Sequence, residues 1–240
     1  MRYLHPVTMK ETFIASGTYI HYKEDEPTGS SEQWSIHELP DGAQFLRVDD
    51  DWRELDGSSI LIEGWRSPES EGSHLERVDV AAFAPKESEI KKVRATYTVM
   101  GELLEVGRTI DEADREHVSI ELPFCYALAP ESLLFAGYEV SHLALNPGKD
   151  TPVVSYLPTF LNPSLAFRPT VFYQSAVFET EETLMLGKIA YTARRYGQTD
   201  PRTGATSTIW LDQHDILLQF RSADSQHRAI LTNYSRKPTG

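Results

Sequence analysis

The sequence predicts a mainly β protein: a single curved antiparallel sheet or open β-barrel of about ten strands, with one short helix and a proline-rich loop. Three observations lead to this fold class. Short runs in which apolar and polar residues alternate recur along the 240-residue chain, separated by Gly, Pro, Asp and Asn. One stretch of helical composition interrupts them near the middle. Pro158, Pro163 and Pro169 then fall within residues 156–170, which indicates an irregular loop.

The first half of the chain is typical of a meander of hairpins. Thr18, Ile20 and Tyr22 alternate with other residues along one face, as a half-buried strand requires. Asp41-Gly42 separates two such runs and is a strong hairpin signal. The strands that we expect in this half are residues 18–22, 33–37, 44–48, 59–65, 77–83, 92–100, 103–110 and 117–122.

Residues 129–138 have the composition of a short helix. Pro130 suits its first turn, and Glu131 suits the positive end of its dipole. Leu133, Leu134 and Phe135 supply an apolar face. The expected strands then resume at residues 171–178, 183–196, 207–211, 216–221 and 228–234. We take residues 1–240 as one β-rich domain, with an N-terminal extension at residues 1–16 and the proline-rich loop at residues 156–170.

The charge and hydropathy patterns argue against several classes of partner. The formal net charge is −13 at pH 7, whereas binding to nucleic acid needs clustered Lys and Arg. No apolar run reaches the roughly 18 residues that a membrane-spanning helix needs, so we do not expect an integral membrane protein. Residues 1–13 contain no uninterrupted apolar segment of the kind found in export signals. We therefore expect a cytoplasmic protein; the oligomeric state is left open.

The order of the elements carries a resemblance. A strand meander precedes the segment LAPESLLFAGYEVSHLALNPGKDTPV, and a hairpin ending in TIWLDQHDILLQFRS precedes a last strand, RAILTNYSR. This order resembles an uncharacterised bacterial domain family with a lipoprotein-carrier-like architecture. The same fold group includes the LolA and LolB carriers, a glycolipid-binding family and the enzyme VioE. The resemblance implies an open, curved antiparallel sheet with an apolar concave face. Unlike the carriers, the chain shows no export signal or lipobox cysteine.

Motifs of catalysis and of cofactor binding are not found. The chain has no G-x-S-x-G, no phosphate-binding loop and no dinucleotide fingerprint. Cys125 is the one cysteine, and its apolar neighbours predict a buried structural residue. Asp212 and His214 alternate on a strand, but two ligands do not make a metal site, and a polar turn is the expected alternative. We therefore expect no metal and no cofactor.

Aromatic residues on the expected strands point more clearly to function. Trp and Tyr combine an apolar body with a polar tip, which suits amphiphilic ligands, although for any single residue sheet packing is the better explanation. If Tyr191 and Arg195 face the concavity, Arg195 lies at its mouth and could receive a carboxylate or phosphate group. The alternative is a rim arginine paired with surface acids. The expected ligand-binding residues are Trp34, Tyr138, Tyr191, Arg195, Trp210 and Phe220.

The leading hypothesis is a non-enzymatic binder of a small apolar or amphiphilic, lipid-like molecule in the concave face. One alternative is a cofactor-independent enzyme similar to VioE. Another is a structural or protein-interaction module, in which the edge of residues 228–234 could accept a partner strand. The helix of residues 133–135 could also fill the concave face itself, and the sequence leaves both possibilities open.

Overall fold

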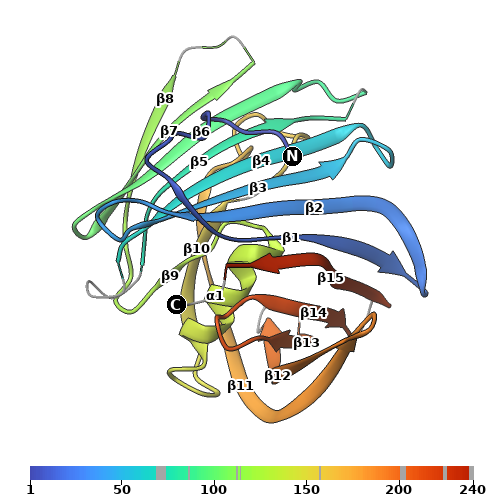
Figure 1. Cartoon of the computed structure of the whole chain (residues 1–240). Coiled ribbons are helices and arrows are strands. Elements are labelled where there is room, and N and C mark those ends of the chain that lie inside the picture. Colours follow the sequence, from blue (N-terminus) through green and yellow to red (C-terminus); the bar gives the residue numbers. More distant parts are fainter. Residues whose placement is uncertain are drawn as a thin grey trace.

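The computed structural model describes residues 1–68, 74–85, 87–111, 113, 115–156, 158–200, 204–223 and 226–237. Within these residues, fifteen strands form one strongly curved sheet around one helix (Figure 1). The order across the sheet is β8-β7-β6-β5-β4-β3-β2-β1-β15-β14-β13-β12-β11-β10-β9. The described pairs are antiparallel except for β9 and β10. The predicted mainly β class is confirmed.

The strands from the two ends of the chain meet in the middle of the sheet, where β1 pairs with β15. The first half of the sheet contains β1 (Thr12–Lys23), β2 (Glu26–Glu38), β3 (Gln44–Trp52), β4 (Ser58–Arg66), β5 (Leu75–Phe83), β6 (Lys92–Met100), β7 (Leu103–Ile110) and β8 (Glu116–Glu121). The second half contains β9 (Ala127–Leu128), β10 (Thr151–Tyr156), β11 (Pro169–Leu186), β12 (Ile189–Asp200), β13 (Ala205–Leu211), β14 (Leu217–Ser222) and β15 (His227–Arg236).

The described strands outnumber both the roughly ten of the predicted fold and the thirteen ranges expected from the sequence, and one expected range is divided differently. Residues 183–196 were expected to form one strand, but the chain turns at Gly187, whose φ is 60°, and the two halves pair as β11 and β12. A left-handed turn between apolar flanks is not visible in the apolar pattern. The two-residue strand β9 and strand β10 were not expected at all.

Helix α1 (Leu133–Leu143) lies inside the curve of the sheet and starts later than predicted. Its N-cap is Ser132, so the predicted range of residues 129–138 placed the helix too early. Glu32 of β2 fixes this start: its carboxylate accepts hydrogen bonds of 2.9 Å each from the backbone N–H groups of Leu133 and Leu134 and from the Ser132 hydroxyl. A carboxylate 100 residues away in the sequence thus satisfies the first turn of the helix.

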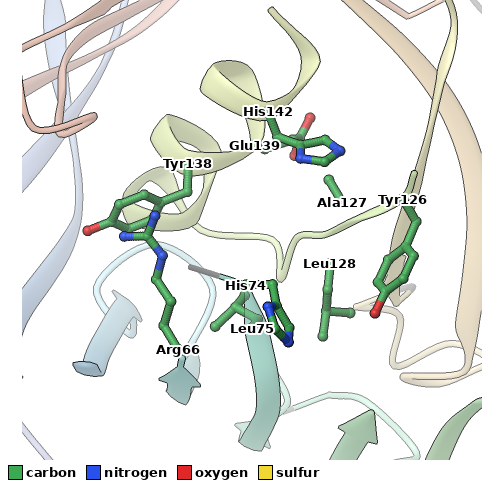
Figure 2. A pocket seen from close by; sticks show the side chains of 9 residues that line it. All are labelled: Arg66, His74, Leu75, Tyr126, Ala127, Leu128, Tyr138, Glu139 and His142. Atoms are coloured by element: carbon green, nitrogen blue, oxygen red, sulfur yellow. The ribbon is translucent and has the colours of Figure 1, made fainter. Parts of the chain in front are cut away.

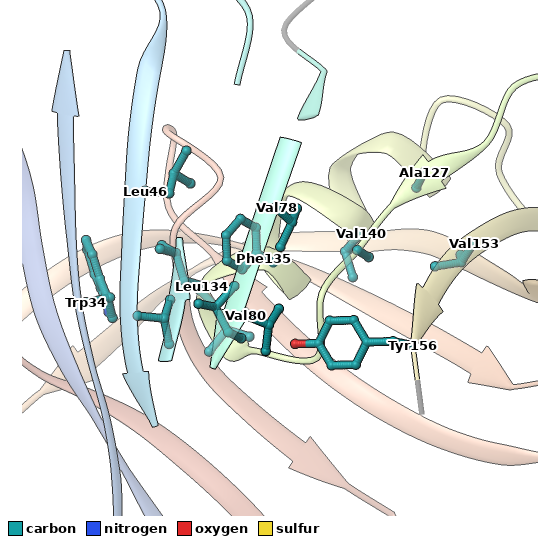
Figure 3. Close-up of a cluster of buried hydrophobic side chains, with 14 of the residues drawn as sticks. Trp34, Leu46, Val78, Val80, Ala127, Leu134, Phe135, Val140, Val153 and Tyr156 are labelled. Carbon is teal, nitrogen blue, oxygen red and sulfur yellow. The ribbon is translucent and has the colours of Figure 1, made fainter. Parts of the chain in front are cut away.

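The apolar side of α1 fills the centre of the concave face (Figure 3). Leu134 is 0% and Phe135 1% exposed. Figure 3 shows them between the inner faces of β2 to β5 and strand β10. Glycine permits the close approach, because a Cβ at Gly137 would lie 2.1 Å from the carbonyl oxygen of Asp215. The protein therefore fills most of its concave face with its own helix.

The N-terminal segment crosses the opposite, outer face of the sheet (Figure 1). Side chains alternate along a strand, so Arg47 and Glu63 point away from the α1 side, toward which Leu46 and Ile62 point. The segment before β1 covers these two charged residues, each of which is 1% exposed. Charged side chains are thus buried on the outer face beneath residues 1–11.

Candidate ligand-binding pocket

A pocket of about 240 Å³ lies at one end of the concave face, between α1, β9 and the adjoining ends of β4 and β5 (Figure 2). Its wall combines apolar and ionisable side chains. The residues that line it are Arg66, His74, Leu75, Tyr126, Ala127, Leu128, Tyr138, Glu139 and His142. Such a mixture, mostly apolar with a few convergent polar groups, is typical of small-molecule sites.

Helix α1 contributes Glu139 and His142, which are three residues apart and therefore lie on one side of the helix. In Figure 2 these two side chains lie close together at the same end of the pocket. Glu139 Oε1 accepts a 2.9 Å hydrogen bond from Gln198 Nε2, and the same amide group also contacts Gln174 Oε1. Burial raises the pKa of Glu139 to about 7, and the nearby Glu131 adds to the rise, while the Gln198 hydrogen bond opposes it.

Tyr138 forms a different part of the wall together with Arg66. The guanidinium carbon of Arg66 lies 4.1 Å from the centroid of the Tyr138 ring, which is a cation–π contact. Arg66 Nη1 also donates to Gln44 Oε1 at 3.3 Å. Burial raises the pKa of Tyr138 to about 12, so its phenol stays neutral. Of the ligand-binding residues expected from the sequence, Tyr138 is the one that lines this pocket.

The two histidines of the pocket are held by hydrogen bonds. His142 Nε2 lies 3.3 Å from the carbonyl oxygen of Cys125, and because a carbonyl can only accept, this nitrogen carries the hydrogen. His74 Nδ1 lies 3.1 Å from the Ser67 hydroxyl. Cys125 is exposed in the structure, so the prediction of a buried structural cysteine is wrong. Its φ of 56° places it in a turn ahead of β9, outside the packed sheet.

Arg195 lies away from the pocket. Gln198 on the same strand reaches Glu139 of α1, and the alternation along β12 puts Arg195 on the opposite side of the sheet. Its guanidinium group donates to Glu179 at 2.8 Å and to Glu182 at 3.4 Å. The structure thus shows the ion-paired arrangement that the sequence had offered as the alternative.

Three of the expected aromatic residues lie elsewhere in the sheet. Trp34 is 1% exposed and stacks on Tyr19 at a centroid distance of 6.1 Å, within the core. Trp210 is nearly buried, and its Nε1 donates to Glu182 at 2.6 Å. Phe220 is half-buried beside His227, with ring centroids 5.9 Å apart. These rings contribute to packing of the sheet.

Tyr191 lines a second hollow, of about 420 Å³, near the β13–β14 turn. Its neighbours there include Tyr234, with ring centroids 6.1 Å apart, and Arg194. Asp212 also lines it, but its Oδ1 accepts from the backbone N–H groups of His214 and Ile216, as an aspartate that forms a turn does. Within the described ranges, no group of three or more His, Cys, Asp or Glu side chains is arranged to hold a metal ion.

The sequence reasoning missed Glu139 and His142. The predicted helix ended at residue 138, one residue before the first of them. A signal was present, because continuing the helix by one turn places Tyr138, Glu139 and His142 on adjoining positions. Arg66 and His74 were missed because pairing between strands brings them to the helix.

Comparison with known proteins supports the fold. The chain is similar to the crystal structure of a β-barrel-like protein of a domain of unknown function, DUF1849, from Brucella abortus. The TM-score is 0.55, and the match covers 97% of this chain and 100% of that chain at 8% sequence identity. At this identity the likeness concerns the fold alone. No protein-family model and no curated protein matches the sequence.

The described part of the chain holds no helix that is both long and apolar enough to cross a membrane.

Proposed function

We propose that the protein binds a small amphiphilic molecule, without a cofactor, in the pocket beside α1. The observation that carries this proposal is the composition of the pocket wall. Leu75, Leu128 and the tyrosine rings offer apolar contacts, while Glu139 and His142 offer polar ones at one end. An amphiphilic ligand would satisfy both parts at once.

The size of the pocket limits the ligand. At roughly 30 Å³ for a water molecule in the liquid, about 240 Å³ corresponds to about eight waters. Because Leu134 and Phe135 occupy the centre of the concave face, a long acyl chain would have to displace them. The proposed ligand is therefore a compact molecule, smaller than the lipid-like ligand that the sequence suggested.

The wider biological setting is part of the same proposal. We propose that the protein shares the binder role implied by the lipoprotein-carrier-like resemblance, with a small molecule in place of a lipoprotein. The net charge of −13 supports a role that does not involve nucleic acid. A cytoplasmic location belongs to this proposal as well.

Native mass spectrometry of freshly purified protein tests the proposal. The expected result is an excess mass that disappears on denaturation, and whose release identifies the molecule. Leu128→Trp, which fills the pocket, should abolish the excess mass, whereas Leu103→Trp, at an exposed position of β7, should retain it. A bare mass for fresh wild-type protein, together with no binding across a broad panel of small amphiphiles, would overturn the proposal.

A second candidate function is a cofactor-independent enzyme. The pKa of Glu139, which burial raises to about 7, favours it, because a group that titrates near neutral pH can both take up and release a proton. Turnover of a bound molecule that is lost in Glu139→Gln, with binding retained, would support this candidate over simple binding.

A further inference from the structure

We propose that the molecule bound in the pocket beside α1 is a small amine, whose ammonium group pairs with the Glu139 carboxylate and whose apolar part lies against Tyr126 and Leu128. This inference rests on the proposed function and specifies its ligand class. The ligand class follows from the charges around Glu139, whereas the proposed function follows from the composition of the pocket wall.

The environment of the Glu139 carboxylate favours a cationic ligand. Its hydrogen-bond donor is the neutral amide of Gln198, and that amide is shared with Gln174. None of the ion pairs between residues that the structure describes includes Glu139. A carboxylate taken from water without a cation is costly, and a bound ammonium group would supply that cation.

The other charged groups around the pocket point in the same direction. Glu131, just ahead of α1, acts on Glu139 as a like charge and raises its pKa further. Arg66 stacks on Tyr138 and donates to Gln44, and Figure 2 shows it at the other end of the pocket from Glu139. His142 and His74 donate to or share hydrogen bonds with Cys125 and Ser67. The end of the pocket near Glu139 is therefore its acidic end.

The aromatic lining adds a second attraction for a cation. Tyr126 and Tyr138 both line the pocket, and a cation near the face of an aromatic ring is stabilised by the negative charge of that face. The formal charge of −13 also raises the local concentration of cationic ligands around the protein. An anionic ligand would be repelled by the Glu139 carboxylate and by the negative faces of the rings.

Three matched probes test the inference: phenethylamine, 2-phenylethanol and 3-phenylpropanoate, titrated at constant ionic strength by isothermal calorimetry near neutral pH. These share one aromatic body and differ in the charge of the polar end. We expect phenethylamine to bind at least about tenfold more tightly than 2-phenylethanol, as a charge-assisted hydrogen bond provides. Glu139→Gln should remove this preference and leave 2-phenylethanol binding unchanged. Glu181→Gln, an exposed acid on β11, should leave the preference intact and serves as the matched control.

A second measurement uses the wild-type protein. Carboxyl ¹³C NMR should show the pKa of Glu139 falling when phenethylamine binds, because a nearby cation favours the charged carboxylate. Equal or tighter binding of the alcohol or the carboxylate would overturn the amine inference and leave the proposed function standing. Failure of phenethylamine and of other small amines to bind would also overturn it, while native mass spectrometry decides the proposed function separately.

Discussion

The two faces of the sheet bury the same kind of side chain in opposite electrostatic settings. On the outer face, β3 and β4 bury acids that are paired with arginines. On the inner face, around α1, Glu32, Asp50 and Glu139 lie without a cationic partner among the described residues. The comparison separates charges that hold the fold together from carboxyl groups that remain able to exchange a proton or meet a ligand.

The outer cluster is a closed network of ion pairs. Arg47 Nη1 donates to Glu11 at 2.6 Å, and its Nε lies 3.5 Å from Glu63. Arg2 binds Asp49 with a 2.6 Å hydrogen bond from Nη2. Burial pushes the pKa of Glu11 upward, but the hydrogen bond from Arg47, with smaller contributions from Thr8 and His37, leaves it below its usual value.

The inner carboxyl groups lie in a different environment. Glu32 pairs across the strands with Asp50 on one side and Tyr19 on the other. Burial raises the pKa of Glu32 to about 7, although the start of α1 donates to its carboxylate. Burial and the neighbouring Glu32 raise the pKa of Asp50 to about 8, while a Trp52 hydrogen bond opposes the rise. Near neutral pH these groups are partly protonated, so the inner face carries less charge than its composition suggests.

The largest expected effect comes from breaking the outer network. Arg47→Met removes the arginine that serves both Glu11 and Glu63, and leaves two buried acids with only histidine and neutral hydrogen-bond partners. We expect a loss of about 3–5 kcal/mol in the free energy of unfolding, measured by urea denaturation. The matched control is Arg195→Met, an exposed pair on β12, with an expected change of about 0–1 kcal/mol. Equal losses in the two variants would remove the distinction between the two kinds of ion pair.

The second effect tests the inner face, where close packing of α1 matters more than ion pairing. Gly137→Ala places a Cβ against the Asp215 carbonyl, so α1 must move away from the β13–β14 turn. Overpacking of this kind costs about 1–3 kcal/mol. The matched control is Ala136→Gly on α1, for which helix propensity predicts a loss of about 1 kcal/mol in the free energy of unfolding. Gly101→Ala would not serve, because the φ of Gly101 is positive. A smaller loss for Gly137→Ala than for the control would show that α1 is not held closely.

The third effect is the dependence of stability on pH. The pKa of Asp50 in the folded state, about 8, is above its ordinary value of 3.8, so folding takes up a proton. Its contribution is therefore complete below the ordinary pKa and is lost as pH rises through about 8. Asp50→Asn should be more stable than the wild type by at least about 1 kcal/mol at about pH 9, with a smaller gain at about pH 6. Urea denaturation at both pH values measures this, and an equal effect at both would contradict it.

For the outer face, we expect the free energy of unfolding to fall as pH falls, which is the opposite of the inner face. The pKa of Glu11 is lowered on folding, so its contribution is present above the ordinary value of 4.5 and is lost as pH falls through the lowered pKa. Glu11→Gln should reduce the loss of stability at acid pH. Asp50→Asn should leave that acid loss unchanged. If either variant alone changed stability at both acid and alkaline pH, the inner and outer carboxyl groups would be coupled.

The smallest expected effect on stability is that of Glu139→Gln. Glutamine has the shape of the protonated acid and keeps an oxygen that can accept from Gln198. At about pH 4, below the ordinary pKa of 4.5, the carboxyl group is mostly protonated in both the folded and the unfolded state, and we expect the free energy of unfolding to stay within about 0.5 kcal/mol of the wild type. A loss as large as that of Arg47→Met would mean that Glu139 serves the fold, and that its place in the pocket is incidental.

The sequence predicts most of the strands, because their boundaries depend on local alternation and turn residues. The expected strands at residues 92–100 and 103–110 coincide with β6 and β7. The helix was expected too early, because Pro130 and Glu131 are local signals, whereas Glu32 on β2 fixes the start of the helix from 100 residues away. The hairpin at Gly187 was missed because apolar residues continue on both sides of it.

The pocket was harder to predict than the sheet. Tyr138 was expected among the binding residues, but Glu139 and His142 depend on one further helical turn. Arg66 and His74 depend on the pairing of β4 with β5, which sequence periodicity does not fix. Arg195 was expected to bind ligand on the assumption that its side of β12 faces inward. The hydrogen bond between Gln198 and Glu139 shows that Gln198 faces inward, so Arg195, three residues away on the strand, faces outward.

The most direct test of this account is a carboxyl ¹³C NMR titration of the unliganded protein, with Glu32→Gln, Asp50→Asn and Glu139→Gln used for assignment. We expect pKa values of about 7 for Glu32, about 8 for Asp50 and about 7 for Glu139, and a pKa below 4.5 for Glu11. If the three inner carboxyl groups and Glu11 all titrated at their ordinary values, the two faces of the sheet would not differ, and the distinction between them would be wrong.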